Sequence, residues 1–417
     1  MSVVYFDASR LFLRGARSSP TGIDRVVFAY ARWLSERRGV SLIPVWSRLG
    51  YLSRLPMRRF QELVEITSGE RREAGPPPGE ATWNALIGAL RRPAAAGRAV
   101  RPLPRPLGRE AAGVAGAVAA ALAAPRALRL QPGALFVNVN HYGLEHPLLL
   151  SRLARAGVRP VVLIHDLIPL EFPEFCSPGG GPRHERRIIA CLNHAWRLIT
   201  NSQATATALT GFAASRGLAL PICVTAPLGI EAAFLDRAGG PTGAAPYFVC
   251  VGTIEPRKNL GFLLALWRRL DERLGEATPP LVLIGRRGWE NEAVVDQLER
   301  SPSVLRHVHE VAGLGDRQVA SLIAGAAALL SPSFAEGYNL PVIEALALGT
   351  PVIASDIPVH RELATGARLI DPLDGPAWME AICAAAASRP AVDRLEPPTW
   401  RAHFGIVESA LDGAVGP

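Results

Sequence analysis

The chain has 417 residues, of which 49% are hydrophobic and 20% charged, so it is long enough for two domains of ordinary size and too apolar for global disorder. Its first residues predict a strand and lack the basic region and apolar run of a secretory signal. The most apolar stretch, residues 111–124, falls short of the roughly 18 apolar residues that a membrane span needs. These features favour a two-domain cytoplasmic protein over a membrane-spanning or secreted one.

The cysteines are scattered, odd in number and lack CxxC spacing, so we expect neither a disulfide framework nor a zinc site. The five are Cys176, Cys191, Cys223, Cys250 and Cys383.

The positive charge is concentrated. Residues 84–130 hold eight arginines and one glutamate, which is +7 of the chain's formal net charge of +8. Two interpretations remain open for residues 91–129: a solvated insertion that covers part of the protein, or a surface that rests on anionic lipid, where each basic residue contributes about 1 kcal/mol. Nucleic-acid binding is not expected, because the segment lacks interleaved aromatic residues and any recognised reader motif.

The first half of the chain alternates apolar strands with amphipathic helices. Strands are expected at residues 3–6, 40–45, 134–138, 160–164 and 197–200, and helices at 23–36, 148–156 and 185–195. Residues 55–132 interrupt this alternation with Pro-, Gly- and Arg-rich stretches and are predicted to form an irregular surface insertion.

A Gly-, Ala- and Pro-rich stretch, residues 229–246, predicts a linker to a second series of strands and helices. Strands are expected at residues 247–251, 281–284, 308–311, 328–331 and 351–354; helices are expected at 259–273, 292–300, 316–325, 341–348 and 399–411. Apolar strands separated by helices indicate parallel sheets covered on both faces. The predicted fold is therefore α/β, with doubly wound domains at residues 1–228 and 247–395, and ligands at the carboxyl ends of their strands.

One candidate phosphate site is the sequence VGTIEPRKNL, residues 251–260. Arg257 and Lys258 follow a predicted strand and precede a predicted helix, where a forked guanidinium and a compact ammonium suit a diphosphate. The alternative is a solvated loop at a helix start. Lys258 is the single lysine among 45 basic residues, which favours a specific chemical role at this position.

A second candidate site is SFAEGYNLPVIEALALGTPVIAS, residues 333–355. Pro341 suits the first turn of a helix and Gly349 its C-terminal end. Glu336 then lies on the loop before the helix and Glu344 on its first turn, where carboxylates can accept hydrogen bonds from sugar hydroxyls and free N–H groups can bind an anion. For Glu344 alone, a favourable interaction with the helix dipole is the simpler explanation.

Together these two motifs resemble the retaining glycosyltransferases of family 4, whose GT-B fold consists of two facing Rossmann-like domains. LIHDLIP at residues 163–169, TNSQ at 200–203 and PTGIDRV at 20–26 resemble the mannosyltransferase-like branch of that family. The resemblance covers nearly the whole chain outside residues 55–132. It implies that residues 1–228 bind the acceptor, that 247–395 bind a nucleotide sugar, and that 396–417 cross back to the first domain.

The resemblance also implies residue roles. Arg257 and Lys258 would neutralise the donor diphosphate, Glu344 would bind the ribose and Glu336 the donor sugar. His165 would face the donor sugar and the acceptor, with Asp166 either on the acceptor side or capping the next turn. Further donor contacts are implied for Gly22, Gly252, Ala312, Gly313, Gly337, Tyr338, Asn339 and Leu340. Tyr338 and Asn339 replace the Phe-Gly of many relatives, and Asn339 is expected to place a side chain beside the donor.

The implied reaction transfers a hexose, with retention of configuration, to a glycan or lipid-linked acceptor in bacterial surface polysaccharide synthesis. GDP-mannose is the preferred donor and UDP-sugars are the alternative. No DxD triplet occurs, so we expect neither metal nor cofactor, with Arg257 and Lys258 in place of a metal ion. Two other classes stay open: another GT-B enzyme, such as an epimerase or a phosphorylase with pyridoxal phosphate on Lys258, and a non-catalytic nucleotide-sugar-binding partner of a polysaccharide assembly complex. A peripheral position on the inner face of the membrane accompanies the lipid interpretation of residues 91–129.

Overall fold

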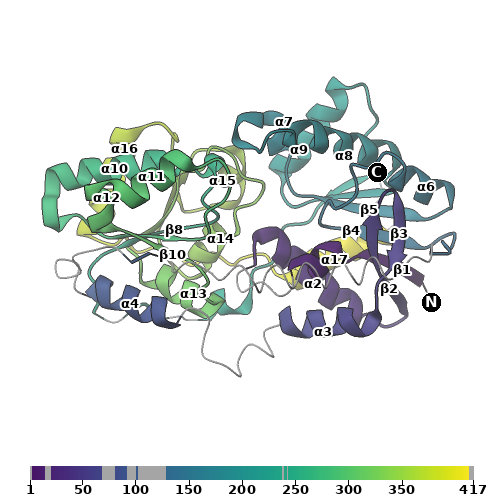
Figure 1. The fold of residues 1–417 in the computed structure, drawn as a ribbon, viewed down its shortest axis with the longest axis horizontal. Helices are drawn as coiled ribbons and strands as arrows, with labels where there is room; N and C mark the ends of the chain where they lie inside the picture. The colour runs from purple at the N-terminus through teal and green to yellow at the C-terminus, as the bar shows by residue number, and fades with distance from the viewer. Residues whose placement is uncertain are drawn as a thin grey trace.

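The computed structural model describes residues 2–14, 20–67, 80–91, 100–101, 128–236, 239–241 and 243–412. Two α/β lobes lie side by side in Figure 1, each built around a twisted sheet with helices on both faces. The N-terminal lobe carries strands β1 to β7 and the C-terminal lobe carries β8 to β13. This arrangement confirms the predicted fold class, two doubly wound Rossmann-like units.

The sheet of the N-terminal lobe has seven strands in the order β3-β2-β1-β4-β5-β6-β7. All its pairings are parallel except that between β2 and β3, which is antiparallel. The strands are β1 (Ser2–Asp7), β2 (Val40–Arg48), β3 (Tyr51–Arg54), β4 (Leu135–Asn138), β5 (Arg159–Ile164), β6 (Arg197–Thr200) and β7 (Cys223–Thr225). The central strands are apolar and buried, as expected for a sheet covered on both faces.

The helices of this lobe are α1 (Ser9–Arg14), α2 (Gly22–Glu36), α3 (Met57–Thr67), α6 (Leu149–Arg155), α7 (Ile168–Glu171), α8 (Gly180–His194) and α9 (Gln203–Ser215). The start of α2 is fixed by a capping box, in which Thr21 and Asp24 exchange side-chain and backbone hydrogen bonds. Arg10 donates to Asp24 Oδ1 at 2.6 Å and to Thr21 Oγ1 at 3.0 Å, which holds that first turn in place.

The C-terminal sheet is entirely parallel, with six strands in the order β10-β9-β8-β11-β12-β13. They are β8 (Phe248–Val251), β9 (Leu281–Ile284), β10 (Val308–Val311), β11 (Ala328–Ser331), β12 (Val352–Ser355) and β13 (Arg368–Ile370). The helices around them are α10 (Leu260–Leu274), α11 (Glu292–Arg300), α12 (Pro302–His307), α13 (Asp316–Gly325), α14 (Leu340–Ala347), α15 (Pro358–Leu363) and α16 (Gly375–Ala387).

Part of the segment predicted as an irregular insertion is regular and reaches the other lobe. It contains α3 and α4 (Glu80–Arg91), and Figure 1 shows α4 beside α13 on the C-terminal lobe. Ala245 donates a backbone hydrogen bond to Leu90. Val100 accepts one from Glu310 at 2.9 Å, beside the edge strand β10. Of the Arg-rich segment 91–129, residues 92–99 and 102–127 lie outside the described residues, so both interpretations of it stay predictions.

The last helix, α17 (Trp400–Leu411), packs against α2 of the N-terminal lobe. Tyr30 Oη lies 2.9 Å from His403 Nε2, and the rings of Trp33 and Phe404 stack 4.5 Å apart. The chain therefore returns to the first lobe at its C-terminal helix.

All five cysteines are free thiols in the structure. Within the described ranges, no helix combines the length and apolar character required to cross a bilayer.

Candidate functional site

Both sequence motifs follow central strands of the C-terminal sheet. From β8 the chain proceeds to β9 and β10 on one side, whereas β11 leads to β12 and β13 on the other. The carboxyl ends of β8 and β11 thus flank the point where the strand order reverses, which is where open α/β sheets bind ligands. VGTIEPRKNL extends from the end of β8, and SFAEGYNL follows β11.

In the loop after β8, the side chain of Lys258 packs against Gly252. Gly252 has φ 148°, and a Cβ atom on it would lie 3.0 Å from Lys258 Cε, so a side chain at this position would crowd the lysine. Arg257 and Lys258 lie on a short 3₁₀ turn, Pro256–Lys258, directly before α10. Lys258 is buried, with 8% of its surface exposed.

Glu336 binds both cations. Lys258 Nζ donates to Glu336 Oε1 at 2.6 Å, and Arg257 Nη1 donates to Oε2 of the same carboxylate. Ser333 Oγ adds a third hydrogen bond, at 2.7 Å to Oε1. Although burial alone would raise the pKa of Glu336, Arg257 and Lys258 lower it well below the ordinary value, so the carboxylate stays ionised.

Glu255 is a second carboxylate at this site, and the sequence interpretation overlooked it although it lies inside the first motif. Its Oε1 is 2.6 Å from Arg257 Nε, while burial raises the pKa of Glu255. Arg257 therefore bridges Glu255 and Glu336, and two cations face two carboxylates in this group. Its overall charge is balanced when both carboxylates are ionised.

Glu344 lies on α14 but beyond its first turn, because the helix begins at Leu340; the expectation of a first-turn position was wrong. Its side chain is 4% exposed and faces Arg25 of α2, with 3.5 Å between Glu344 Oε1 and Arg25 Nη1. Burial, together with the nearby carboxylates of Asp316 and Glu231, raises the pKa of Glu344 to about 7 despite the arginine.

Asn339 is the residue predicted to place a side chain beside the donor. It adopts a left-handed conformation, φ 69° and ψ 63°, directly before α14. Its Nδ2 lies 2.8 Å from Ser331 Oγ and 2.8 Å from His360 Nε2, both in the C-terminal lobe. Tyr338 is also buried, and its hydroxyl donates to the Leu228 carbonyl at 2.8 Å. Both side chains are thus bound to protein partners and shape the loop that carries Gly337.

The N-terminal lobe closes directly on this loop. A Cβ atom on Gly337 would lie 2.2 Å from the carbonyl oxygen of His165, so only glycine allows this approach of the two lobes. Ser202 Oγ donates to the Gly337 carbonyl at 3.0 Å. Gly22 is the first residue of α2 and does not precede that helix as expected. It faces Leu340 at the start of α14, where a Cβ atom on Gly22 would lie at an ordinary contact distance of 3.7 Å from the Leu340 side chain.

His165 follows β5 and is buried at the interface of the lobes. Its Nε2 lies 2.8 Å from the Val139 carbonyl, and since a carbonyl only accepts, Nε2 carries the proton. Burial lowers the pKa of His165, so the ring is neutral and Nδ1 is unprotonated. Asp166 Oδ1 accepts from the Ile168 backbone at 3.1 Å, which is the capping arrangement considered for it.

His141, after β4, is a neighbour that sequence reasoning missed. Its ring centroid lies 5.2 Å from that of His165, and its Nε2 lies 2.8 Å from the Leu163 carbonyl. Burial and the neighbouring His165 hold the pKa of His141 well below its ordinary value. Its left-handed backbone, φ 62°, follows Asn138, whose side chain accepts from the His141 backbone.

Ala312 and Gly313, predicted near the base of the nucleotide, follow β10 at the same edge of the sheet. The chain there enters α13, whose first residue Asp316 forms an ion pair with Arg25 at 2.7 Å. The structure therefore places them on the Glu344 side of the cleft.

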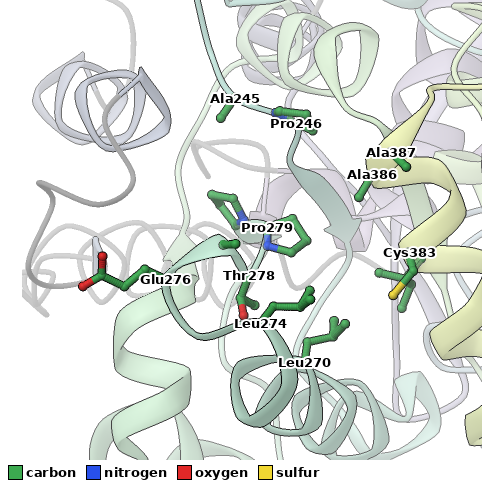
Figure 2. Close-up of a pocket in the computed structure, with 13 residues that line it drawn as sticks. Ala245, Pro246, Leu270, Leu274, Glu276, Thr278, Pro279, Cys383, Ala386 and Ala387 are labelled. Carbon is green, nitrogen blue, oxygen red and sulfur yellow. The ribbon is translucent and has the colours of Figure 1, made fainter.

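A separate cavity of about 450 Å³ lies at the opposite end of β8 (Figure 2). Its walls include Pro246 before β8, Leu270 and Leu274 of α10, and Cys383 of α16. It is mostly apolar, and it lies away from the carboxyl ends of the strands, so we do not assign it to the site.

Among the residues that the structure describes, no group of three or more His, Cys, Asp or Glu side chains is arranged to hold a metal ion.

Two facing Rossmann-like lobes with a charged, phosphate-compatible loop at the cleft define a protein of the GT-B class. Residues 245–388, which lie in the C-terminal lobe, match the family model described as "Glycosyl transferases group 1". This match confirms the predicted resemblance to family 4 glycosyltransferases.

The relatives in sequence include mannosyltransferases. The chain is 31% identical over 234 residues to "Serotype-specific mannosyltransferase WbdA" of Escherichia coli, an alignment that covers 52% of this chain and 28% of that protein. It is 36% identical over 141 residues to "O-antigen chain mannosyltransferase RfbU" of Salmonella typhimurium, covering 33% of this chain and 37% of the relative. The alignments thus span well under half of these relatives.

Solved structures share the whole fold. Sucrose-phosphate synthase from Thermosynechococcus elongatus superposes with a TM-score of 0.61 over the full length of both chains, at 15% identity. Anabaena HepE in complex with UDP and glucose gives a TM-score of 0.60 over 99% of this chain and 100% of that chain, at 14% identity. At such low identity the likeness establishes the fold alone.

Proposed function

We propose that this protein is a retaining glycosyltransferase that moves mannose from GDP-mannose to a glycan or lipid-linked glycan acceptor in bacterial polysaccharide synthesis. The observation that carries the proposal is the Glu336 carboxylate held by both Arg257 and Lys258 at the switch point of the sheet, facing the lobe that carries His165. The relatives named as mannosyltransferases support mannose as the sugar. UDP-sugars are the alternative donors.

The site suits heterolysis of a sugar–diphosphate bond. As that bond breaks, negative charge grows on the departing nucleoside diphosphate while the sugar becomes oxocarbenium-like. Preorganised donors directed at that growing charge lower the barrier. Arg257 and Lys258, which are held by Glu336 and Glu255, would act as such donors. We infer that these two cations stabilise the leaving group, and that transfer needs no metal ion.

Glu336 has a second role in this proposal. It stays ionised, so it can accept hydrogen bonds from hydroxyls of the donor sugar while it orients the two cations. Neutral His165 offers unprotonated Nδ1 as an acceptor on the opposite lobe, where an incoming acceptor or the transferred sugar would lie. Glu344, at the far end of the cleft, would accept from the ribose hydroxyls.

Nucleotide binding and product analysis test the proposal. Thermal-shift measurements with GDP, UDP, ADP and dTDP identify the nucleotide, and we expect the largest stabilisation from GDP. Incubation of the matching nucleotide sugar with candidate acceptors, followed by NMR of the anomeric proton, should show a product with the configuration of the donor. An inverted product would refute retention. Failure of every nucleotide to bind would refute the assignment as a transferase and its non-catalytic alternative alike.

The purified protein also tests the phosphorylase alternative and the proposed attachment to the membrane. An absorbance spectrum with a pyridoxal phosphate band would indicate a phosphorylase. For a lipid-linked acceptor we also propose peripheral attachment to the membrane, and sedimentation with anionic vesicles but not with neutral ones is the expected result.

A further inference from the structure

Arg25 reaches from the N-terminal lobe into the part of the cleft that holds Glu344, yet no role follows for it from the motifs above. It lies on the first full turn of α2, within the sequence TGIDRV. We propose that Arg25 and Glu344 bind the same ribose hydroxyls of the nucleotide from opposite lobes, so that ribose recognition closes the cleft. The inference rests on the proposed nucleotide-sugar function and adds a positioning and specificity residue to it.

The guanidinium of Arg25 has two partners, and the helix that carries it is fixed. Its Nη2 donates to Asp316 Oδ1 at 2.7 Å, and the face of Phe234 lies 5.4 Å from its central carbon. The start of α2 from which it projects is itself fixed by the Thr21–Asp24 capping box. Such a clamped arginine pays little further conformational entropy when it binds a ligand.

The remaining arm of the guanidinium makes no hydrogen bond. Arg25 Nη1 is buried and finds no hydrogen-bond acceptor among the described residues. The nearest carboxylate oxygen, Glu344 Oε1, is 3.5 Å away, close enough for electrostatic attraction but too long for a good hydrogen bond. A buried donor without a partner is costly, so this atom indicates a site completed by another group.

A sugar hydroxyl beside these two atoms can bridge them better than a phosphate can. A hydroxyl donates one hydrogen bond and accepts others, so it can donate to Glu344 and accept from Arg25 Nη1 at once. A phosphate oxygen only accepts, and it would face the carboxylates of Glu344, Asp316 and Glu231, which surround Arg25 from α14, α13 and the loop before residue 232. The acidic surroundings therefore favour the ribose over the diphosphate.

The position of Arg25 explains why ribose binding would close the cleft. Arg25 belongs to α2 of the N-terminal lobe, whereas Glu344 and Asp316 belong to the C-terminal lobe. A hydroxyl shared by Arg25 and Glu344 is bound fully only when the two lobes are as close as they are here, where Arg25 Nη2 lies 2.7 Å from Asp316 Oδ1.

The test compares GDP with 2′,3′-dideoxy-GDP, which keeps the base and the diphosphate but lacks both ribose hydroxyls. Dissociation constants are measured by calorimetry for wild type, R25Q and R25K, with UDP and its dideoxy counterpart used instead if the wild type prefers UDP. We expect R25Q to weaken GDP binding by about 10- to 100-fold, the range for a lost buried hydrogen bond to a charged group. Its binding of dideoxy-GDP should change much less, so that the preference for the ribonucleotide falls by close to the same 10- to 100-fold. R25K keeps the positive charge but loses the planar guanidinium. Its affinity for GDP should lie between those of wild type and R25Q.

R32Q, a change on the same helix, is the matched control and should behave as wild type in both measurements. Circular dichroism and thermal unfolding show whether each variant is folded, and the ribo-to-dideoxy ratio is internal to each variant. Equal weakening of both ligands by R25Q would overturn the inference, because Arg25 would then act on the phosphates or on lobe packing. Unchanged binding of both would overturn it as well. If the wild type binds no nucleoside diphosphate, the proposed function itself fails.

Discussion

Replacing Lys258 with alanine tests the role assigned to the single lysine of the chain. The ammonium lies 2.6 Å from Glu336, and the Lys258 side chain is 9% exposed. At an effective dielectric constant of about 20, a unit charge about 3 Å away contributes roughly 5 kcal/mol, and only the part that grows as the bond breaks lowers the barrier. Loss of one preorganised donor of this kind reduces kcat by about 10²- to 10³-fold, equivalent to about 3–4 kcal/mol. We expect K258A to lose turnover on that scale.

The assay is initial-rate release of nucleoside diphosphate at saturating donor, with donor affinity measured separately. K258R should restore only part of the rate. The Lys258 side chain packs so closely on Gly252 that a Cβ atom there would lie 3.0 Å from Lys258 Cε, and a planar guanidinium is wider than an ammonium. R268A, an exposed change on the neighbouring helix α10, is the matched control and should retain full activity. A K258A protein that is folded and turns over at more than about a third of the wild-type rate would refute the reasoning.

Three further predictions follow from named contacts. G337A should abolish most turnover while leaving the fold intact, because the added methyl group would lie 2.2 Å from the His165 carbonyl oxygen and keep the two lobes apart. A G337A protein with full turnover would contradict this. Donor affinity should rise between about pH 6 and 8 as Glu344, whose pKa is raised to about 7, loses its proton and becomes an acceptor. Calorimetry with the nucleotide sugar, whose phosphate diester groups do not titrate there, checks this, and E344Q should remove the pH dependence. Y30F deletes the buried contact with His403 and should lower stability by about 1 kcal/mol, a shift of a few degrees or less in Tm, at unchanged turnover; an unaltered melting curve would argue against that contact.

Much of the candidate site in the C-terminal lobe could be predicted because its residues are close in sequence to the elements that position them. Lys258 and Arg257 follow the end of β8 directly, and Glu336 lies four residues before α14, so each motif carries its own strand, loop and helix signals. The parallel sheets followed from apolar strands alternating with helices.

Contacts between the lobes could not be predicted in the same way. Arg25 and Asp316 are 291 residues apart, and their pairing depends on how two independently folded sheets face one another. Helix α4 presents an apolar face whose partner belongs to the other lobe, so composition alone indicated an irregular insertion.

Backbone geometry explains the positions of Asn339 and Glu344 within the second motif. Asn339 tolerates the left-handed conformation at the start of α14, and this conformation turns its side chain back to Ser331 and His360. Because α14 starts at Leu340, Glu344 falls beyond the first turn, and its carboxylate depends on Arg25 instead of the helix dipole.

The central claim is that two protein cations, Arg257 and Lys258, replace a metal ion in stabilising the departing diphosphate. The most direct measurement is turnover of the donor in excess EDTA. The account predicts that wild-type turnover is unchanged by the chelator and unchanged again when Mg²⁺ is restored. Loss of turnover in EDTA, with full recovery on addition of Mg²⁺, would contradict it.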